Sequence, residues 1–308
     1  FPVRLLALDI DGTLVGHSLT LPDRTARAIR AAARRGVHVS LATGRMATSA
    51  QAFADELGLT GPIIAYQGAL IRDMPTATSA PRPGGRRVGR LRYHPPPPPD
   101  VARDAIRWSL ENGLEPHVNH LERIVIPDWS PYVDDYSRFL GARAHTVADL
   151  EAYVERPVTK VISVADAPVP MQLLPDARRD FAGRAAPTVS HPRFLEFVAP
   201  GVSKGAALAR LARSLGIPLA QTMAIGDNMN DLEMLEVAGH AVAMPSAPPD
   251  VRAVARYLAP PLELEGAAEM IEQLVLAEPR RAEAAARRLA AEAAEARVDT
   301  EAFLAATG

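Results

Sequence analysis

The chain has 308 residues, of which 48% are hydrophobic and 23% are charged, which is typical of a globular protein with room for two domains. The formal net charge of -2 argues against a nucleic-acid partner, because such partners require a basic face. The absence of cysteine excludes disulfides, thiolate metal sites and cysteine nucleophiles. No apolar run approaches the roughly 20 residues that span a bilayer, and no signal-peptide pattern is present, so we expect a cytoplasmic protein without a membrane partner.

The N-terminal part of the chain alternates short apolar runs with helical stretches. Three runs followed by turn residues are predicted to be strands buried on both faces: Val3–Leu8, Val37–Ala42 and Ile63–Tyr66. A helix is predicted over Pro22–Arg35, with proline near its start and Gly36 just past its end. This alternation predicts an α/β fold with a doubly wound, Rossmann-like parallel sheet.

The pattern changes after about Arg72. Residues 75–99 are rich in proline and glycine. Less regular elements follow, with helices predicted near 100–112, 131–140 and 168–182 and strands around 124–126, 158–164 and 194–198. We interpret residues 73–200 as an inserted α/β domain.

The regular α/β pattern returns after residue 200. Helices are predicted over Ser203–Leu215 and Leu232–Val237, and strands over Thr222–Ile225 and His240–Met244. The core domain is therefore predicted to consist of residues 1–72 and 201–276, from both sides of the insert.

The C-terminal segment, residues 277–308, is rich in alanine, glutamate and arginine. Pairs such as Glu283 and Arg287, four residues apart, favour a solvated helix. Its apolar stripe is thin, so we expect a surface helix or a partly disordered tail, with a dimerisation helix as the alternative.

Two carboxylates stand close together just after the first predicted strand. Asp9 and Asp11 are separated by one residue and followed by Gly12. Such carboxylates repel each other unless a cation lies between them or one is protonated, and a hard divalent ion such as Mg²⁺ resolves the conflict. One of them can then serve as nucleophile and the other as general acid and base. The alternative is an ordinary turn, for which Asp-Gly-Thr is also suited.

Two further motifs offer groups that bind phosphate. Thr43 and Gly44 follow the second predicted strand, where a hydroxyl and backbone N–H groups can hold phosphate oxygens; a helix cap is the alternative. Lys204 lies at the start of a predicted helix, where the helix dipole already favours anions; a solvated surface charge is the alternative.

A second acidic cluster follows the strand over Thr222–Ile225. Asp227, Asn228, Asn230 and Asp231 supply oxygens for a metal and donors to orient them, or else form an Asx-rich loop and helix cap. Ligands of open α/β sheets bind at the carboxyl ends of the strands. We therefore expect all these motifs to converge on one crevice.

In this order the motifs resemble those of the haloacid dehalogenase superfamily. More closely, the chain resembles the Cof-type phosphatases, which carry a large cap of type C2B after the third core strand. The resemblance covers Val3 to about Leu276. It rests on the stretches Leu8-Asp9-Ile10-Asp11-Gly12-Thr13-Leu14, Thr43-Gly44-Arg45, Gly201-Val202-Ser203-Lys204-Gly205 and Gly226-Asp227-Asn228.

The resemblance implies a role for each acidic residue. Asp9 is implied to be the nucleophile that forms an aspartyl-phosphate and also a Mg²⁺ ligand. Asp11 is implied to protonate the leaving alkoxide, to deprotonate the hydrolytic water and to bind the metal through its backbone carbonyl. Asp227 is implied to be the remaining metal ligand, with Asp231 supporting the site.

The resemblance also implies a phosphate-binding set. Its members are Thr43, Gly44, Lys204 and Asn230. Two departures stand out: Gln67 replaces the usual Asn of Asn-Gly-Ala as a supporting residue, and Pro245-Ser246 replaces the usual Gly-Asn after Ala243-Met244. Both are expected to alter substrate choice or rate.

The expected activity is hydrolysis of a small phosphorylated metabolite: a sugar phosphate, a flavin-pathway phosphate or pyridoxal phosphate. The insert would be the cap that selects it. A phosphosugar mutase with the same nucleophile and a non-catalytic binding protein on the same fold remain alternatives. The oxygen ligands do not separate Mg²⁺ from Mn²⁺, and either a monomer or a homodimer is expected.

Overall fold

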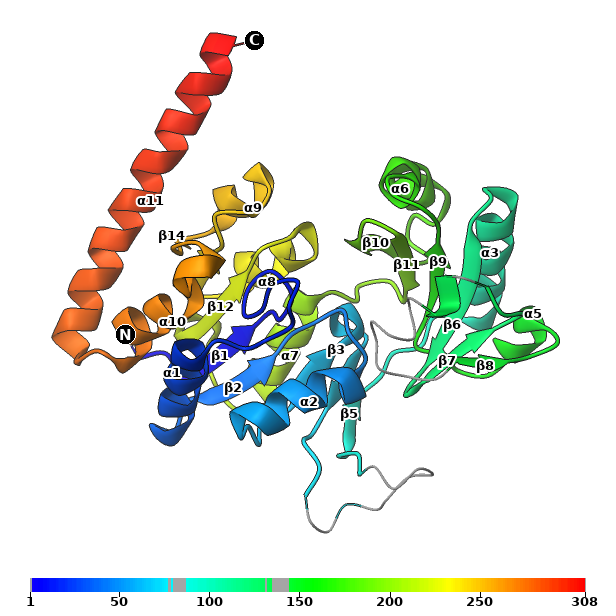
Figure 1. Cartoon of the computed structure of the whole chain (residues 1–308), viewed down its shortest axis with the longest axis horizontal. Coiled ribbons are helices and arrows are strands. Elements are labelled where there is room, and N and C mark those ends of the chain that lie inside the picture. Colours follow the sequence, from blue (N-terminus) through cyan, green and yellow to red (C-terminus); the bar gives the residue numbers. More distant parts are fainter. Residues whose placement is uncertain (1, 77–78, 80–86, 131, 135–143, 308) are drawn as a thin grey trace. The chain divides into compact units, whose positions relative to one another are not determined.

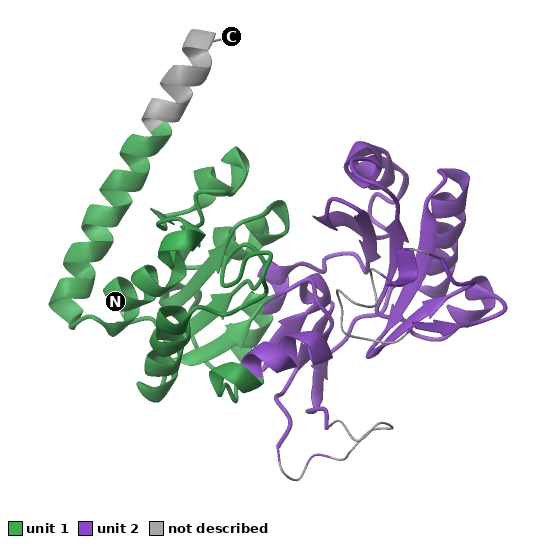
Figure 2. Ribbon diagram, in the orientation of Figure 1, with its two compact units in different colours: residues 1–42, 55–61, 208–308 green, residues 43–54, 62–207 purple. Residues whose placement is uncertain are grey.

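The computed structural model describes residues 2–76, 79, 87–130, 132–134 and 144–307, with side chains up to residue 297. Figure 2 colours its two compact units. The first unit comprises residues 1–42, 55–61 and 208–308, and the second comprises residues 43–54 and 62–207. Among the described residues, no helix is both long and apolar enough to cross a membrane.

The first unit is built on a five-stranded parallel sheet with the order β14-β13-β12-β1-β2 (Figure 1). The strands are β1 (Leu5–Leu8), β2 (His38–Leu41), β12 (Thr222–Gly226), β13 (His240–Ala243) and β14 (Tyr257–Leu258). Leu8 lies opposite Leu41 on one side and Ile225 on the other. The carboxyl ends of the three central strands are therefore level, which places the residues that follow them at one edge of the sheet.

Helices complete the first unit. They are α1 (Asp23–Arg34), α8 (Leu232–Val237), α9 (Pro249–Val254), α10 (Gly266–Ile271) and α11 (Pro279–Thr307), with short helical turns at Leu219–Gln221, Met229–Asp231 (η3), Leu262–Leu264 and Glu272–Leu276. In α1 the buried face is carried by Thr25, Ala28, Ile29 and Ala32, at the spacing of one helix side. Helix α7 (Lys204–Ser214) begins in the second unit and continues into the first.

The C-terminal helix α11 packs against the first unit. Its apolar stripe, thin in sequence, is buried at Ala282, Ala286, Leu289 and Ala293. The Arg297 guanidinium donates to the backbone carbonyl of Ala255 at 2.6 Å. Small side chains allow close helix packing, so four residues are enough to bury one face of this helix.

The second unit contains a small antiparallel sheet and a larger mixed one. Helix α2 (Ala47–Leu57) precedes the small sheet of β3 (Ile63–Ala65), β4 (Leu70–Arg72) and β5 (Leu91–Tyr93). Its strand β3, predicted as a third parallel strand, instead pairs antiparallel with β4. The reason is the tight reversal at η1 (Tyr66–Gly68), which brings the chain straight back along β3.

The larger sheet has six strands in the order β10-β11-β9-β6-β7-β8. They are β6 (Glu115–His120), β7 (Arg123–Ile126), β8 (Ala144–Thr146), β9 (Lys160–Val164), β10 (Ala186–His191) and β11 (Phe194–Val198), and the accompanying helices are α3 (Pro99–Glu111), α5 (Leu150–Tyr153) and α6 (Val169–Asp180). The pairings are antiparallel except for β7 with β8. Trp108 packs edge-on against Phe181 and Phe197 in the core of this part.

All six strands fall within the predicted insert of residues 73–200, although the compact unit that holds them also includes 43–54 and 62–72. The helix predicted at 131–140 lies largely outside the described residues. The domain boundaries at 72 and 200 stay a prediction.

Candidate functional site

Asp9 and Asp227 occupy equivalent places on adjacent strands. Asp9 follows β1 and Asp227 follows β12, and these strands run parallel with Leu8 opposite Ile225. The backbone N–H of Asp9 donates to the carbonyl of Ile225 at 3.1 Å, so the pairing continues to the end of the strands. Two motifs more than 200 residues apart in sequence (227 against 9) are thereby brought side by side.

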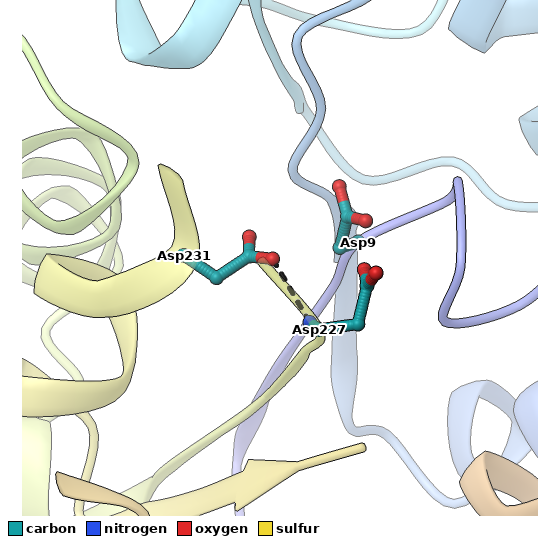
Figure 3. A group of neighbouring side chains, drawn as sticks. All are labelled: Asp9, Asp227 and Asp231. Atoms are coloured by element: carbon teal, nitrogen blue, oxygen red, sulfur yellow. Dashed lines mark hydrogen bonds between the residues drawn. The ribbon is translucent and has the colours of Figure 1, made fainter. Parts of the chain in front are cut away.

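Three carboxylates converge at this edge. One oxygen from each of Asp9, Asp227 and Asp231 lies within 4.8 Å of the others, and Figure 3 shows the three side chains directed toward one another. Asp9 is 5% exposed and Asp231 is fully buried. Asp227 is half-buried. Carboxylates this close repel one another unless a cation lies among them or one is protonated. An oxygen-only donor set of this kind suits a hard divalent ion.

Asp231 holds the loop after β12 through backbone contacts. Its Oδ2 atom accepts hydrogen bonds from the N–H groups of Asp227 at 3.0 Å and Asn228 at 3.1 Å. Asn228 and Asp231 also form a capping box at the start of η3. The cost of burying this carboxylate is thus offset by oriented donors, and Asp227 is fixed in position.

Gly12 and Thr13 support Asp227 from the loop after β1. Gly12 has a φ of +82°, and a Cβ atom there would lie 2.6 Å from the carboxyl carbon of Asp227. Thr13 Oγ1 donates to Asp227 Oδ1 at 3.1 Å. Thr13 belongs to a predicted motif, but no role was predicted for it. A buried hydroxyl two residues after an acidic pair is the signal that could have suggested one.

Asp11 and Asn230 are close in sequence to members of this cluster. Asp11 is half-buried and forms an isolated bridge with Val15. Its carboxylate is not part of the three-carboxylate group that the described residues form. Asn230 is half-buried within η3, between the acidic residues of its motif.

In the second unit, the loops after β2 and β3 are tied together by backbone hydrogen bonds. Thr43 N–H donates to the Ile64 carbonyl at 2.9 Å, and Gln67 N–H donates to the Thr43 carbonyl at 3.1 Å. Thr43 Oγ1 accepts from the N–H of Arg45 at 3.1 Å. The Thr43 side chain is buried, so both loops have a fixed shape.

Close contacts extend this network to Lys204. A Cβ on Gly44 would lie 3.0 Å from the Gln67 amide carbon, and a Cβ on Gly68 would lie 2.6 Å from the Ser203 carbonyl carbon. Lys204 is fully buried at the start of α7. Thr43, Gly44, Gln67 and Lys204 are therefore linked through one set of loops in this unit.

The loop after β3 has a strained backbone. Tyr66 and Gln67 have φ values of 53° and 57°, in the left-handed region that β-carbon-bearing residues rarely adopt. Asn, the residue expected at position 67 from the family resemblance, tolerates this region better than Gln. Strain of this kind is typical of functional loops that the surrounding structure holds in place.

Comparison with known proteins identifies a matching family and named relatives. The family of haloacid dehalogenase-like hydrolases matches residues 6–271. An HMP-PP phosphatase of Cronobacter sakazakii is 30% identical, over 83% of this chain and 89% of its own length. The 5-amino-6-(5-phospho-D-ribitylamino)uracil phosphatase YitU of Bacillus subtilis is 27% identical, over 87% of this chain and 96% of its own length.

Solved structures share the fold. A haloacid dehalogenase-like hydrolase from Bacteroides thetaiotaomicron superposes with a TM-score of 0.73 at 26% identity, covering 88% of this chain and 98% of its own. A sugar phosphatase of haloacid dehalogenase (HAD) subclass IIB superposes with a TM-score of 0.71 at 23% identity. The match covers 87% of this chain and 98% of its own. The α/β fold class predicted from the sequence is confirmed by these neighbours.

Proposed function

We propose that this chain, which belongs to the haloacid dehalogenase-like hydrolases, hydrolyses a small phosphomonoester. The reaction would proceed through an aspartyl-phosphate on Asp9. The predicted membership in the Cof-type branch is confirmed, and the chain is a phosphoric monoester hydrolase. The observation that carries the proposal is the convergence of Asp9, Asp227 and Asp231 at the carboxyl ends of adjacent parallel strands.

The proposed reaction has two steps. A carboxylate oxygen of Asp9 attacks phosphorus and the bond to the leaving oxygen breaks, while Asp11 gives its proton to that oxygen. Asp11 then takes a proton from water, whose oxygen attacks phosphorus and frees Asp9 and inorganic phosphate. The near-complete burial of Asp9 supports this role, since a poorly hydrated carboxylate is a stronger nucleophile.

The acidic cluster fits a divalent cation, because its donors are all oxygens and a cation among them would relieve their mutual repulsion. Asp9 and Asp227 would hold the ion, with the backbone carbonyl of Asp11 as a third ligand. Mg²⁺ bound there would supply positive charge that offsets the phosphoryl oxygens. Asp231 would orient Asp227 through its two backbone hydrogen bonds rather than bind the ion.

Thr43, Gly44, Lys204 and Asn230 are proposed to bind the phosphoryl group. The burial of Lys204 supports this for the lysine, because an ammonium group is costly to bury unless an anion or strong acceptors surround it. The fixed loops around Thr43 and Gly44 support it for the backbone donors. Preorganised donors of this kind supply most of the catalysis in phosphoryl transfer.

The proposed substrate is a sugar phosphate, a flavin-pathway phosphate or pyridoxal phosphate. The named relatives support a small phosphorylated metabolite, since one is named for HMP-PP and another for a ribitylaminouracil phosphate. A cytoplasmic location and a monomeric or homodimeric state remain part of the proposal.

The test is phosphate release from a panel of these esters with Mg²⁺, comparing the wild type with Asp9→Asn. The exposed Asp250→Asn variant is the matched control, since it makes the same chemical change away from the cluster. We expect turnover by the wild type and the control, and its loss in Asp9→Asn and in EDTA. Equal turnover by Asp9→Asn would exclude Asp9 as nucleophile.

A further inference from the structure

Ser190 lies at an irregular point of the larger sheet of the second unit. Strands β10 and β11 pair regularly from Ala186 to Val189, and the register then shifts between Val189 and His191. The shift is a β-bulge with Ser190 as the inserted residue. Bulges redirect a side chain relative to the regular ladder and are frequent beside active sites.

The Ser190 side chain is directed to the loop after β2. A Cβ atom on Gly44 would lie 3.5 Å from the Cβ of Ser190, in ordinary van der Waals contact. Ser190 is half-buried. Residues of both the proposed phosphate-binding loop and the predicted insert therefore meet at this point, within one compact unit.

A buried ion pair fixes the direction of the Ser190 hydroxyl. Ser190 Oγ donates to Glu196 Oε1, and the other oxygen of Glu196 lies 2.7 Å from Lys160 Nζ. Both charged side chains are 2% exposed. Glu196 lies opposite Ile162 in the β9–β11 pair, so Lys160 is its diagonal neighbour on the same face of the sheet.

The loop after β3 covers this ion pair. Lys160 Nζ lies 5.3 Å from the centre of the Tyr66 ring, over its face, and Tyr66 Oη donates to the Leu121 carbonyl. Burial lowers the pKa of Lys160, and Glu196 opposes that shift. A buried ion pair contributes little net stability compared with apolar side chains of the same size, but loss of either member is costly, so each charged side chain holds the other in place.

We propose that Ser190 is a specificity-determining residue that selects substrates whose leaving group carries a hydrogen-bond donor, a hydroxyl or amine, near the phosphoester. A serine hydroxyl has one proton and two lone pairs. Because the proton is committed to the charged Glu196, the oxygen of Ser190, whose Cβ lies next to Gly44, can act only as an acceptor toward a further group. A polyol or amino leaving group satisfies it, whereas a purely apolar one leaves it without a partner.

The inference rests on the proposed function and deepens it, since it names the class of leaving group. It is tested with two pairs of esters that differ in hydroxyl groups. The pairs are glycerol 1-phosphate with propyl phosphate, and glucose 6-phosphate with cyclohexylmethyl phosphate. The quantity measured is the ratio of kcat/KM within each pair for the wild type, Ser190→Ala and Ser190→Thr.

We expect the wild type to prefer the hydroxylated ester in at least one pair, and Ser190→Ala to reduce that preference about tenfold, as for the loss of one hydrogen bond. Ser190→Thr, which keeps the hydroxyl, should retain most of it. Ser130→Ala is the matched control: Ser130 also donates to a glutamate, Glu115, elsewhere in the larger-sheet region. It should leave the ratio unchanged.

The outcomes separate the two proposals. An unchanged ratio in Ser190→Ala, with the wild type active, overturns the inference and leaves the proposed function intact. An equal fall in Ser130→Ala also overturns it, because the effect would then be a general loss of stability. If the wild type releases phosphate from no ester in either this set or the metabolite panel, both proposals fall together.

Discussion

In the first unit the buried carboxylate of Asp231 accepts hydrogen bonds from backbone N–H groups three and four residues away. In the second unit the buried carboxylate of Glu196 is held instead by Lys160, from another strand of the sheet. The first arrangement is local, because its backbone donors come from the same loop as the carboxylate. The second depends on strand register and leaves a full charge without a partner if either member is lost. The two regions should therefore respond very differently to substitution.

The largest effect is expected from Lys160→Met. It leaves the buried charge of Glu196 without an opposite charge, which should cost about 4 kcal/mol in free energy of unfolding. The double variant Lys160→Met with Glu196→Leu removes both charges and should recover most of that loss. Urea denaturation of both proteins checks this, and a double variant as unstable as the single one would show that packing rather than charge is at stake.

A smaller effect is expected from Gly12→Ala, which tests the local arrangement. The new Cβ would meet the Asp227 carboxyl group at a φ of +82°, so we expect a cost of about 3 kcal/mol and a marked loss of phosphate release. Gly36→Ala is the control, since its φ is +83° and no atom lies within 4 Å of the new Cβ. It should cost about 1 kcal/mol. Equal costs in the two variants would mean that Asp227 moves aside freely.

The pH dependence of the first unit gives a third test. Burial lowers the pKa of His240 to about 4, and its Nδ1 lies 3.1 Å from Tyr257 Oη. Between about pH 4 and pH 6.5, His240 is therefore protonated to a greater extent in the unfolded chain than in the folded protein. Stability should be full above that window and fall by about 2 kcal/mol as pH drops through it, allowing for partial solvent screening.

His240→Gln serves as the comparison protein for this effect. Its amide cannot take up a proton in this range and can still contact the Tyr257 hydroxyl. Urea denaturation at pH 4.5 and pH 7 should show a smaller difference for His240→Gln than for the wild type. The same difference in both proteins would place the titrating groups elsewhere.

The smallest effect is expected from Gln67→Asn. Asn adopts the left-handed region more readily, so relief of the strained φ should add about 0.5 kcal/mol of stability. Leu19→Asn is the control, because Leu19 has a φ of 56° and is 43% exposed. Thermal denaturation measures the stability of both variants. A more stable Leu19→Asn together with a less stable Gln67→Asn would mean that the contact of the Gln67 side chain beside Gly44 stabilises the protein by more than the strained backbone destabilises it.

The convergence of Asp9 and Asp227 could be predicted from the sequence because both follow directly after a strand, whereas the inclusion of the Asp231 carboxylate in place of that of Asp11 was not predicted. Parallel strands align their carboxyl ends, so Asp9 and Asp227 come together once the strands are recognised. The predicted strands at 158–164 and 194–198 were also confirmed as β9 and β11. The roles of Asp9, Asp11, Thr43 and Lys204 in the reaction stay predictions.

The sequence did not predict the contacts of the second unit for a physical reason. Lys160, Glu196 and Ser190 are single polar residues in strands, and only the β9–β11 register and the bulge in β10 bring them together. A change of one residue in register would turn each side chain to the other face. The antiparallel pairing of β3 was missed similarly, because Gln67 gives no local sign of a left-handed turn.

Helix α11 has one further consequence for the molecule. Strand β14 is the edge of the parallel sheet, and α11 packs along it, with Arg297 donating to Ala255 just before that strand (Figure 1). An open sheet edge is a template on which another chain can add a strand. The helix lies beyond residues 6–271, the part that the family shares. A segment outside the shared family region thus covers the edge at which this sheet could otherwise be extended.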